Sequence, residues 1–389
     1  LWSTHGRSRS GTRRRSLWAS GSEVSMLSAR TILFRRLEAV PEGDRSARAR
    51  LALLVLAAML VVVASLSVAT GASDASLTAV VKWWLGLVPE DTLSQRDRIV
   101  IQEIRLPRTA LGILVGAALA VSGALMQGLF RNPLADPGIV GVSAGAGLGA
   151  IAVIVLGGTV LGPVVSLFDI YALPLAAFSG GLATTLLLYR VATRRGQTSI
   201  ATMLLAGIAL AALSGALSGI LVYLADDRQL RDLTFWALGS LGGATWTKIL
   251  AAGPVIALAF VATPLLARGL DALALGEASA RHLGVPVQRL KAAAILSVAA
   301  ATGASVAVSG GIGFIGIVVP HLLRLIIGPD HRFLLPASAL LGASLLLLAD
   351  SVSRTIVPPA ELPIGIVTAV FGAPFFLWVL LRRRGVLDL

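Results

Sequence analysis

The feature that most constrains this chain is an apolar run of about 20 residues without charge, which recurs along its length. A helix of that length crosses the hydrocarbon core of a bilayer, which is about 30 Å thick. The runs cover residues 51–73, 109–130, 138–168, 170–189, 196–225, 249–267, 292–327, 333–349 and 362–381, and the run at 292–327 is interrupted only by His321 and Arg324. Since 56% of the residues are hydrophobic and only 14% are charged, most of the chain must face lipid rather than water.

One of these runs is too long for a single span. Residues 292–327 would form a helix of about 54 Å at 1.5 Å per residue. Gly310 and Gly311, which follow Ser309, weaken a helix interior and are expected to divide the run in two. The sequence therefore predicts an all-α polytopic membrane protein with ten transmembrane helices per subunit.

The distribution of basic residues predicts the orientation of these spans. The net charge of +13 could indicate a nucleic-acid partner, but 11 of the 33 Lys and Arg lie in residues 1–50 and most others flank apolar runs. With both termini in the cytoplasm, 24 basic residues lie inside and nine outside, as the positive-inside rule favours. We expect a multi-pass protein of the bacterial inner membrane, surrounded by lipid, with both termini cytoplasmic and no nucleic-acid partner.

The first 48 residues differ in kind from the rest. Arginines alternate there with Ser, Gly and Thr, and no apolar face is sustained. Residues 1–48 are therefore predicted to be a disordered basic tail, and they lack the pattern of a secretory signal. Residues 49–389 are predicted to form the ten-helix domain.

The sequence contains no recognisable constellation of catalytic residues. The chain has no cysteine, and its four histidines, at positions without metal-ligand spacing, are His5, His282, His321 and His331. None of its three lysines follows a glycine, so a phosphate-binding loop is excluded. We expect no catalytic site, no metal and no cofactor on this chain. If transport uses ATP, then ATP and Mg²⁺ bind to a partner.

The loop at residues 269–291 carries the most informative local pattern. Asp271 is expected to cap a short helix that runs to His282, and Gly284 and Pro286 end it. One side of this helix would carry Leu273, Glu277 and Arg281. The neighbouring stripe would carry Leu270, Ala274 and Ala278. Such a helix suits insertion into a partner's groove or an interfacial position on lipid heads, and the spacing alone does not distinguish the two.

Four segments resemble the permeases of ABC importers for iron-siderophores, haem and cobalamin. They are A-L-G-E-A-S-A-R-H-L-G-V in this loop, R-L-P-R-T-A-L-G-I-L-V-G-A-A-L-A-V-S-G-A-L-M-Q-G-L-F-R-N-P-L-A-D-P-G at 105–138, G-F-I-G-I-V-V-P-H-L-L-R at 313–324, and E-L-P-I-G-I-V-T-A-V-F-G-A-P-F-F-L-W at 361–378. The likeness runs in order from about residue 50 to the C-terminus. The resemblance implies a homodimer of ten-helix subunits with a translocation path on the dimer axis. It also implies two ATP-binding cassette subunits on the cytoplasmic side and a periplasmic binding protein on the other.

The resemblance assigns roles to three groups of residues. It makes residues 273–281 the coupling helix, with contacts to the ATPase from Leu273, Ala274, Leu275, Gly276, Glu277, Ala278, Ala280 and Arg281. It places binding-protein docking on Arg105, Arg108 and Arg354, which the predicted topology puts outside. A bidentate guanidinium–carboxylate pair would orient the partner there, although Arg105 and Arg108 could instead anchor a helix end at lipid heads. The cytoplasmic gate is expected at the start of the fifth span, at Ser199, Ile200, Ala201 and Thr202.

Two further questions concern the cargo and the source of energy. His321 could suggest a haem ligand, but its motif looks the same in relatives that carry other cargo, and Arg324 one turn later suggests a structural pair. Haem is favoured as cargo, then a ferric siderophore, then cobalamin. The rival class is an ion-driven secondary transporter, which needs carboxylates at mid-membrane. The central parts of the spans contain none, because Asp350 and Glu361 lie near span ends.

Overall fold

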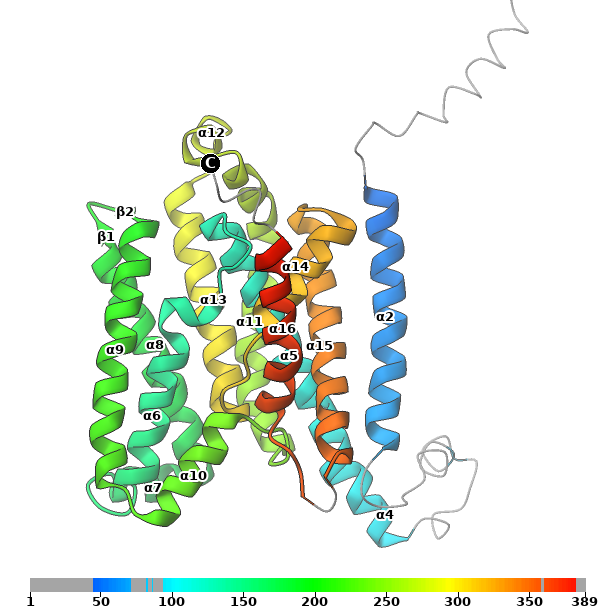
Figure 1. Cartoon of the computed structure of the whole chain (residues 1–389), viewed down its shortest axis with the longest axis vertical. Helices are drawn as coiled ribbons and strands as arrows, with labels where there is room; N and C mark the ends of the chain where they lie inside the picture. The colour runs from blue at the N-terminus through cyan, green and yellow to red at the C-terminus, as the bar shows by residue number, and fades with distance from the viewer. Residues whose placement is uncertain (1–44, 71–81, 83–85, 87–93, 358–359, 383–389) are drawn as a thin grey trace, which may run out of the picture. The chain divides into compact units, whose positions relative to one another are not determined.

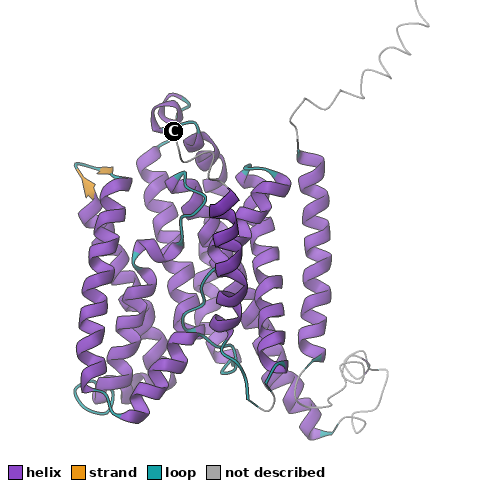
Figure 2. Cartoon of the chain, in the orientation of Figure 1, coloured by secondary structure: helices purple, strands orange, loops and turns teal. Residues whose placement is uncertain are grey.

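The architecture is a bundle of helices that run between two ends of the molecule (Figures 1 and 2). It is a computed structural model that describes residues 45–70, 82, 86, 94–357 and 360–382. The predicted basic tail lies outside the described residues except for its last four positions, and the helix that follows already begins at Ser46.

The described residues form helices and one pair of short strands. In chain order they are α2 (Ser46–Ala69), α4 (Gln95–Ile99), the π-helix η2 (Val100–Arg105), α5 (Leu106–Phe130), the 3₁₀-helix η3 (Pro137–Val140), α6 (Val142–Leu156), α7 (Gly162–Phe168), the 3₁₀-helix η4 (Asp169–Tyr171), α8 (Ala172–Ala192), β1 (Thr193–Arg194), β2 (Gln197–Thr198), α9 (Ile200–Leu224), α10 (Asp227–Leu238), α11 (Trp246–Ala274), α12 (Glu277–His282), α13 (Val287–Ser309), α14 (Ile315–Ile327), α15 (His331–Thr355) and α16 (Ile364–Arg382). The two strands form one short antiparallel hairpin.

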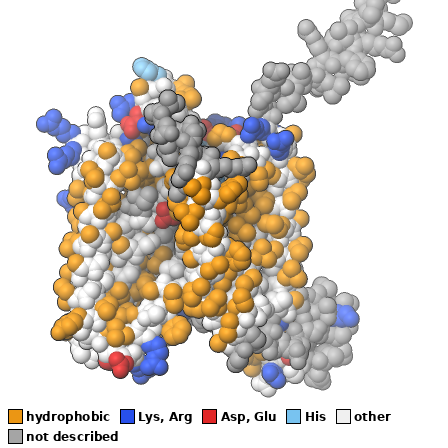
Figure 3. Space-filling view, in the orientation of Figure 1, with side chains coloured by type: hydrophobic (Ala, Val, Ile, Leu, Met, Phe, Trp, Pro, Cys, Tyr) orange, Lys and Arg blue, Asp and Glu red, His pale blue; other side chains and the backbone are white. Residues whose placement is uncertain are grey.

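The helices account for the predicted number of spans. Among the described residues, seven are long and apolar enough to cross a membrane, and three shorter apolar helices (α6, α14 and α16) complete ten. On the face that Figure 3 shows, hydrophobic side chains cover much of the side of the bundle, and most charged groups lie at its two ends. The all-α fold with ten spans is therefore confirmed in outline.

The two ends of the bundle carry different elements. The start of α2, the β1–β2 hairpin, α12 and the last turn of α16 lie at one end, here named the α12 end (Figure 1). The elements α4, α7 and α10 lie at the other, the α10 end. The shared position of the start of α2 and the end of α16 agrees with an even number of spans.

The predicted break in the long apolar run is confirmed. Helix α13 ends at Ser309 and α14 begins at Ile315. Gly310 has φ of 70°, a left-handed conformation that glycine adopts without steric cost. The Ser240 N–H donates to the Ser309 carbonyl at 2.8 Å, so part of the interrupted backbone is paired with another segment.

Some boundaries differ from the prediction. The third span is shorter than 138–168, because α6 ends at Leu156 and a turn leads to the short α7. Helix α10 was not predicted. Asp226 and Gln229 form a capping box at its start, and the helix is amphipathic rather than apolar, so a search for apolar runs could not detect it.

Helix α5 forms the centre of the bundle and packs against α15, α13, α14 and α11. Nearly all of its residues from Pro107 to Leu129 are buried. Small residues bring the backbones together: a Cβ on Gly116 would lie 2.5 Å from the Gly342 carbonyl oxygen of α15, and one on Gly123 would overlap the Gly316 carbonyl of α14. Close backbone approach replaces the hydrophobic effect as the source of helix association in lipid.

Candidate functional site

The predicted coupling segment, residues 269–291, lies at the α12 end and contains the end of α11, a turn and the short helix α12. The short helix begins later than the sequence predicted. Asp271 does not cap a helix, because α11 continues through it to Ala274. Its carboxylate instead contacts His331, accepting from the backbone N–H at 3.0 Å and lying 2.6 Å from Nδ1. The chain turns at Gly276, whose φ is 104°, and α12 begins at Glu277. The predicted single helix from Asp271 to His282 is therefore wrong.

The exposed face of this segment also differs from the predicted stripe. Leu273 and Ala280 are fully buried and cannot meet a partner in this conformation. The residues that face outward are Ala274, Leu275, Ala278, Ser279, Arg281, His282 and Leu283. Leu275 and Leu283 are 68% and 64% exposed, so two large apolar side chains lie on the outer surface of this segment. The grouping of Leu273 with Glu277 and Arg281 on one surface is therefore wrong, since Leu273 is buried, Glu277 is partly exposed and Arg281 is exposed.

Glu277 faces a lysine that the sequence did not single out. Lys291 is only 1% exposed, and its Nζ lies 2.6 Å from Glu277 Oε1. The same ammonium donates to the Thr198 carbonyl at 2.8 Å. Gln288 Oε1 accepts from the Thr198 N–H, also at 2.8 Å. The coupling segment, the start of α13 and the β1–β2 hairpin are thus joined through two side chains one turn apart.

The four residues predicted as the gate lie together where the hairpin passes into α9. Ser199 is the N-cap of α9, and its hydroxyl accepts from the Thr202 N–H at 3.3 Å. Ile200 and Ala201 begin the helix. The hydroxyl of the preceding Thr198 is not free, because it lies 2.9 Å from the hydroxyl of Thr193 across the hairpin. The gate assignment itself stays a prediction.

At the α10 end, Arg108 lies in a buried ion-pair network. Its guanidinium is 2.8 Å from Asp350 Oδ1 on α15 and 2.8 Å from Glu361 Oε1 before α16. Asp350, which is fully buried, also lies 3.1 Å from Arg354. One carboxylate therefore sits between two guanidinium groups, and α5, α15 and the start of α16 are connected.

The structure places the three predicted docking arginines together, but their cationic groups point into the chain. Arg105 is 3% exposed and donates to the carbonyls of Val68 and Ala69 at the end of α2. Arg354 donates to the Thr70 carbonyl at 3.0 Å. A carboxylate from a partner would have to compete with these acceptors. Docking through these arginines stays a prediction, and anchoring of Arg105 and Arg108 in lipid heads does not fit their burial.

Glu361 makes this network sensitive to acid. The hydrogen bonds from Arg108 lower the pKa of Glu361 below its ordinary value of 4.5. Because the pKa of Glu361 is lower in the folded state, its interaction with Arg108 stabilises the fold fully above pH 4.5. This stabilisation is lost as the pH falls through the folded-state pKa. We expect the melting temperature of the parent to fall below pH 4.5 more steeply than that of Glu361→Gln, which lacks this titration. Parallel melting curves for the two proteins from pH 6 to 3 would contradict this assignment.

The loop after α5 returns toward the middle of the bundle and carries the carboxylate of Asp136. A Cβ on Gly316 would lie 3.1 Å from both Pro137 and the Leu119 carbonyl, which is in the middle of α5. Asp136 precedes Pro137 and accepts from the Gly138 N–H at 2.7 Å. The sequence-based expectation covered only the central parts of the spans, and Asp136 lies in a loop outside them. No local signal indicates the re-entry, which depends on packing against α14.

Asp136 borders a cavity of about 200 Å³ between η3, α13 and α14. Ser143 and Thr302 also line it. The Thr302 hydroxyl is buried and has no hydrogen-bond partner among the described residues. The cavity has polar groups and room for several waters, at about 30 Å³ per water.

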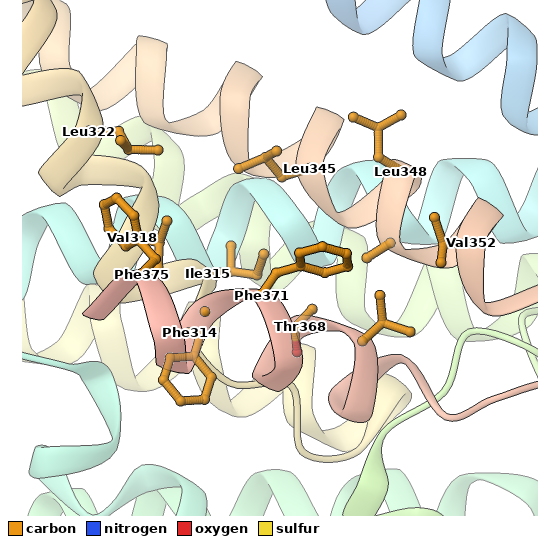
Figure 4. Close-up of a pocket in the computed structure, with 13 residues that line it drawn as sticks. Phe314, Ile315, Val318, Leu322, Leu345, Leu348, Val352, Thr368, Phe371 and Phe375 are labelled. Atoms are coloured by element: carbon orange, nitrogen blue, oxygen red, sulfur yellow. The ribbon is translucent and has the colours of Figure 1, made fainter. Parts of the chain in front are cut away.

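A larger cavity of about 400 Å³ lies between α14, α15 and α16 (Figure 4). Its lining is aromatic and aliphatic, with Phe314, Phe371 and Phe375 among its members. Thr368 is its one polar side chain, and that hydroxyl donates to the Gly365 carbonyl. The cavity therefore offers no charged or free polar side chain to hold a metal chelate.

The contacts of His321 and Arg324 reach other helices. His321 is buried and its ring lies edge-on to Phe375, with centroids 6.2 Å apart. Arg324 donates to Gln127 on α5. Gln127 in turn donates to the Ile317 carbonyl at 3.2 Å, so these polar groups join α5 to α14. Within the described part of the chain, no three His, Asp or Glu side chains are grouped to bind a metal ion.

Ten apolar helices around a glycine-packed centre, with a short exposed helix at one end, define a polytopic membrane protein of the transporter class. Residues 56–382 match the FecCD transport family. The chain therefore belongs to the FecCD transport family.

Named relatives agree with this assignment. The chain is 50% identical over 281 residues to the hemin transport system permease protein HmuU of Yersinia pestis, covering 72% of this chain and 83% of the relative. It is 46% identical over 313 residues to the vitamin B12 import system permease protein BtuC of Klebsiella pneumoniae, covering 80% and 90%. A solved metal-chelate type ABC transporter in an inward-facing conformation superposes with a TM-score of 0.73 at 33% identity, covering 85% of this chain and 98% of that one.

Proposed function

We propose that this chain is the membrane-spanning permease of an ATP-driven importer that moves a metal chelate across the cytoplasmic membrane into the cell. The observation that carries the proposal is the family match over residues 56–382, which includes every helix from α4 to α16. The permease performs no chemistry, and ATP with Mg²⁺ binds to separate ATPase subunits. Two copies of the chain form the path, and a periplasmic binding protein delivers the cargo.

Haem is the cargo we favour, with cobalamin as the alternative. The relative at 50% identity is a hemin permease and the one at 46% is a vitamin B12 permease. A difference of four percentage points in sequence identity does not distinguish haem from cobalamin as the cargo, and both are bulky macrocycles that hold a metal. Neither relative carries a siderophore by name, so the ferric siderophore now ranks third.

The orientation we propose puts the α12 end in the cytoplasm. Arginines cluster at this end, for example Arg194 and Arg195 in the β1–β2 hairpin and Arg281 on α12, as expected for a cytoplasmic face. The α10 end with the buried arginine network then faces the periplasm. The start of α2 and the end of α16 lie on the cytoplasmic side in this orientation.

The exposed leucines of the coupling segment are the proposed contact with the ATPase. Apolar side chains in a partner's groove contribute more to binding than charges at a rim. We expect Leu275→Glu combined with Leu283→Glu to reduce copurification of the ATPase about tenfold or more while the permease stays folded. Ile356→Glu, a change at an equally exposed apolar residue at the α10 end, is the control. Undiminished ATPase binding by the double variant would exclude this contact surface.

Transport into liposomes tests the proposal as a whole. The permease is reconstituted with its candidate ATPase, and the binding protein is loaded in turn with haem, cobalamin and a ferric siderophore. ATP-dependent entry of one cargo would establish the importer and identify what it carries. Failure to bind an ATPase, together with uptake driven by a proton or sodium gradient, would instead indicate a secondary transporter.

A further inference from the structure

Lys291 is the largest fully buried side chain among the described residues, and it is charged. A buried ammonium is costly to desolvate unless its hydrogen bonds are satisfied. Its two acceptors belong to different parts of the chain, Glu277 on α12 at 2.6 Å and the Thr198 carbonyl on β2 at 2.8 Å. The residue therefore connects two segments that are 79 positions apart from one another through a single atom, Nζ.

The connection to the hairpin is double. One turn before Lys291 on α13, the Gln288 side chain accepts from the Thr198 N–H at 2.8 Å. Both polar groups of the Thr198 peptide region are thus held by α13, in addition to the hairpin pairing with Thr193. Thr198 is followed directly by Ser199, the N-cap of α9. Because Thr198 and Ser199 are adjacent in the chain, a displacement of the Thr198 peptide group also moves the N-cap of α9.

The connection to α12 is a single ion pair. Glu277 is the first residue of α12. Its side chain is 29% exposed, whereas the side chain of Lys291 is 1% exposed. The exposed Arg281 lies farther from Glu277, at 3.5 Å, and an exposed pair of this kind contributes little. Since breaking a partly buried pair leaves the buried ammonium uncompensated, α12 and the Thr198 peptide are favoured to move together.

We propose that Lys291 is the positioning residue that transmits movement of the coupling helix α12 to the β1–β2 hairpin and the cytoplasmic start of α9. This rests on the proposed function, since it requires an ATPase that moves α12. If Lys291 only stabilised the local fold, apolar residues in place of both Lys291 and Glu277 would preserve coupled transport. If Lys291 transmits the movement, the same replacement would not, because an apolar pair cannot hold the Thr198 carbonyl.

The test therefore uses the double variant Lys291→Met with Glu277→Met, in the reconstituted complex with its ATPase and binding protein. Removing both charges avoids an unpaired buried ion, so the protein is expected to fold. We expect ATP hydrolysis to continue while cargo uptake per ATP hydrolysed falls about tenfold, the size of a typical coupling between sites. Arg332→Met, which removes an exposed ion-paired cation at the same end of the bundle, should match the parent.

A second readout separates transmission from stability. Hydrogen–deuterium exchange is followed on residues 193–202 and on α12, with and without ATP. In the parent, both segments should change protection together when ATP binds. In the double variant, α12 should still respond while residues 193–202 no longer follow.

The outcomes distinguish this inference from the proposed function. If the parent transports and the double variant transports equally well with both segments responding, Lys291 has no transmitting role. If the parent itself neither binds an ATPase nor transports with ATP, the proposed function fails instead. Should the Glu277 change weaken ATPase binding, Lys291→Met alone keeps the α12 surface and decides between the same outcomes.

Discussion

Asp350→Ala is expected to reduce the stability of the protein by about 3–5 kcal/mol, the range for removing one partner of a buried ion pair. Asp350 is fully buried and lies between Arg108 and Arg354. Its loss leaves two buried guanidinium groups, with Glu361 as the remaining nearby carboxylate on one of them. The expected result is a large fall in the melting temperature of the purified protein in detergent.

A matched control comes from the other end of the same helix. Asp330 pairs with Arg332 at 2.6 Å, but both side chains are substantially exposed. Because exposed pairs contribute about 0–1 kcal/mol, Asp330→Asn should melt close to the parent. Equal melting temperatures for Asp350→Ala and Asp330→Asn would show that the Arg108 network does not stabilise the α10 end.

Gly123→Ala is expected to destabilise the protein, though less than Asp350→Ala, because there is no space for a methyl group at this position. A Cβ on Gly123 overlaps the Gly316 carbonyl, and backbone cannot rotate away as a side chain can. Helices α5 and α14 would have to separate, at a cost of about 1–3 kcal/mol typical of overpacking. The measurement is again thermal unfolding in detergent, together with the yield of folded protein.

The sign of the effect is what decides this second test. Alanine is a better helix former than glycine by about 1 kcal/mol, so Gly→Ala in an open helical position should be neutral or stabilising. Gly147 in α6 is such a position, because no atom lies within 4 Å of the place that a Cβ would take. If Gly123→Ala and Gly147→Ala both raise the melting temperature, the close approach of α5 and α14 is not required for the fold.

Much of the topology could be predicted because lipid imposes a simple rule. A span needs a minimum length of uninterrupted apolar residues, so counting such runs recovers α2, α5, α9 and most others. The break after Ser309 was also predictable, since consecutive glycines carry a local backbone preference that does not depend on distant partners.

The coupling segment shows where this reasoning fails. The sequence predicted a helix near residues 271–282 and a turn at Gly284, and α12 does lie within that range. Its start was wrong because Asp271, a good capping residue in isolation, is used by His331, 60 positions away. A tertiary contact replaced the local one, and no spacing within the loop could show it.

The sequence by itself determined the class of the protein: an all-helical membrane bundle, its approximate spans and the family to which it belongs. Apolar length, glycine breaks and contiguous motifs are local properties, and each can be read without knowing what lies opposite. Only the tertiary structure decided the partners of the charged residues. Arg108 finds Asp350 242 positions away, Lys291 finds Thr198 93 positions away, and Asp136 reaches the interior through a loop. The physical reason is that a buried charge is stabilised by whatever the fold brings to it, and that pairing is not encoded by its neighbours in the chain.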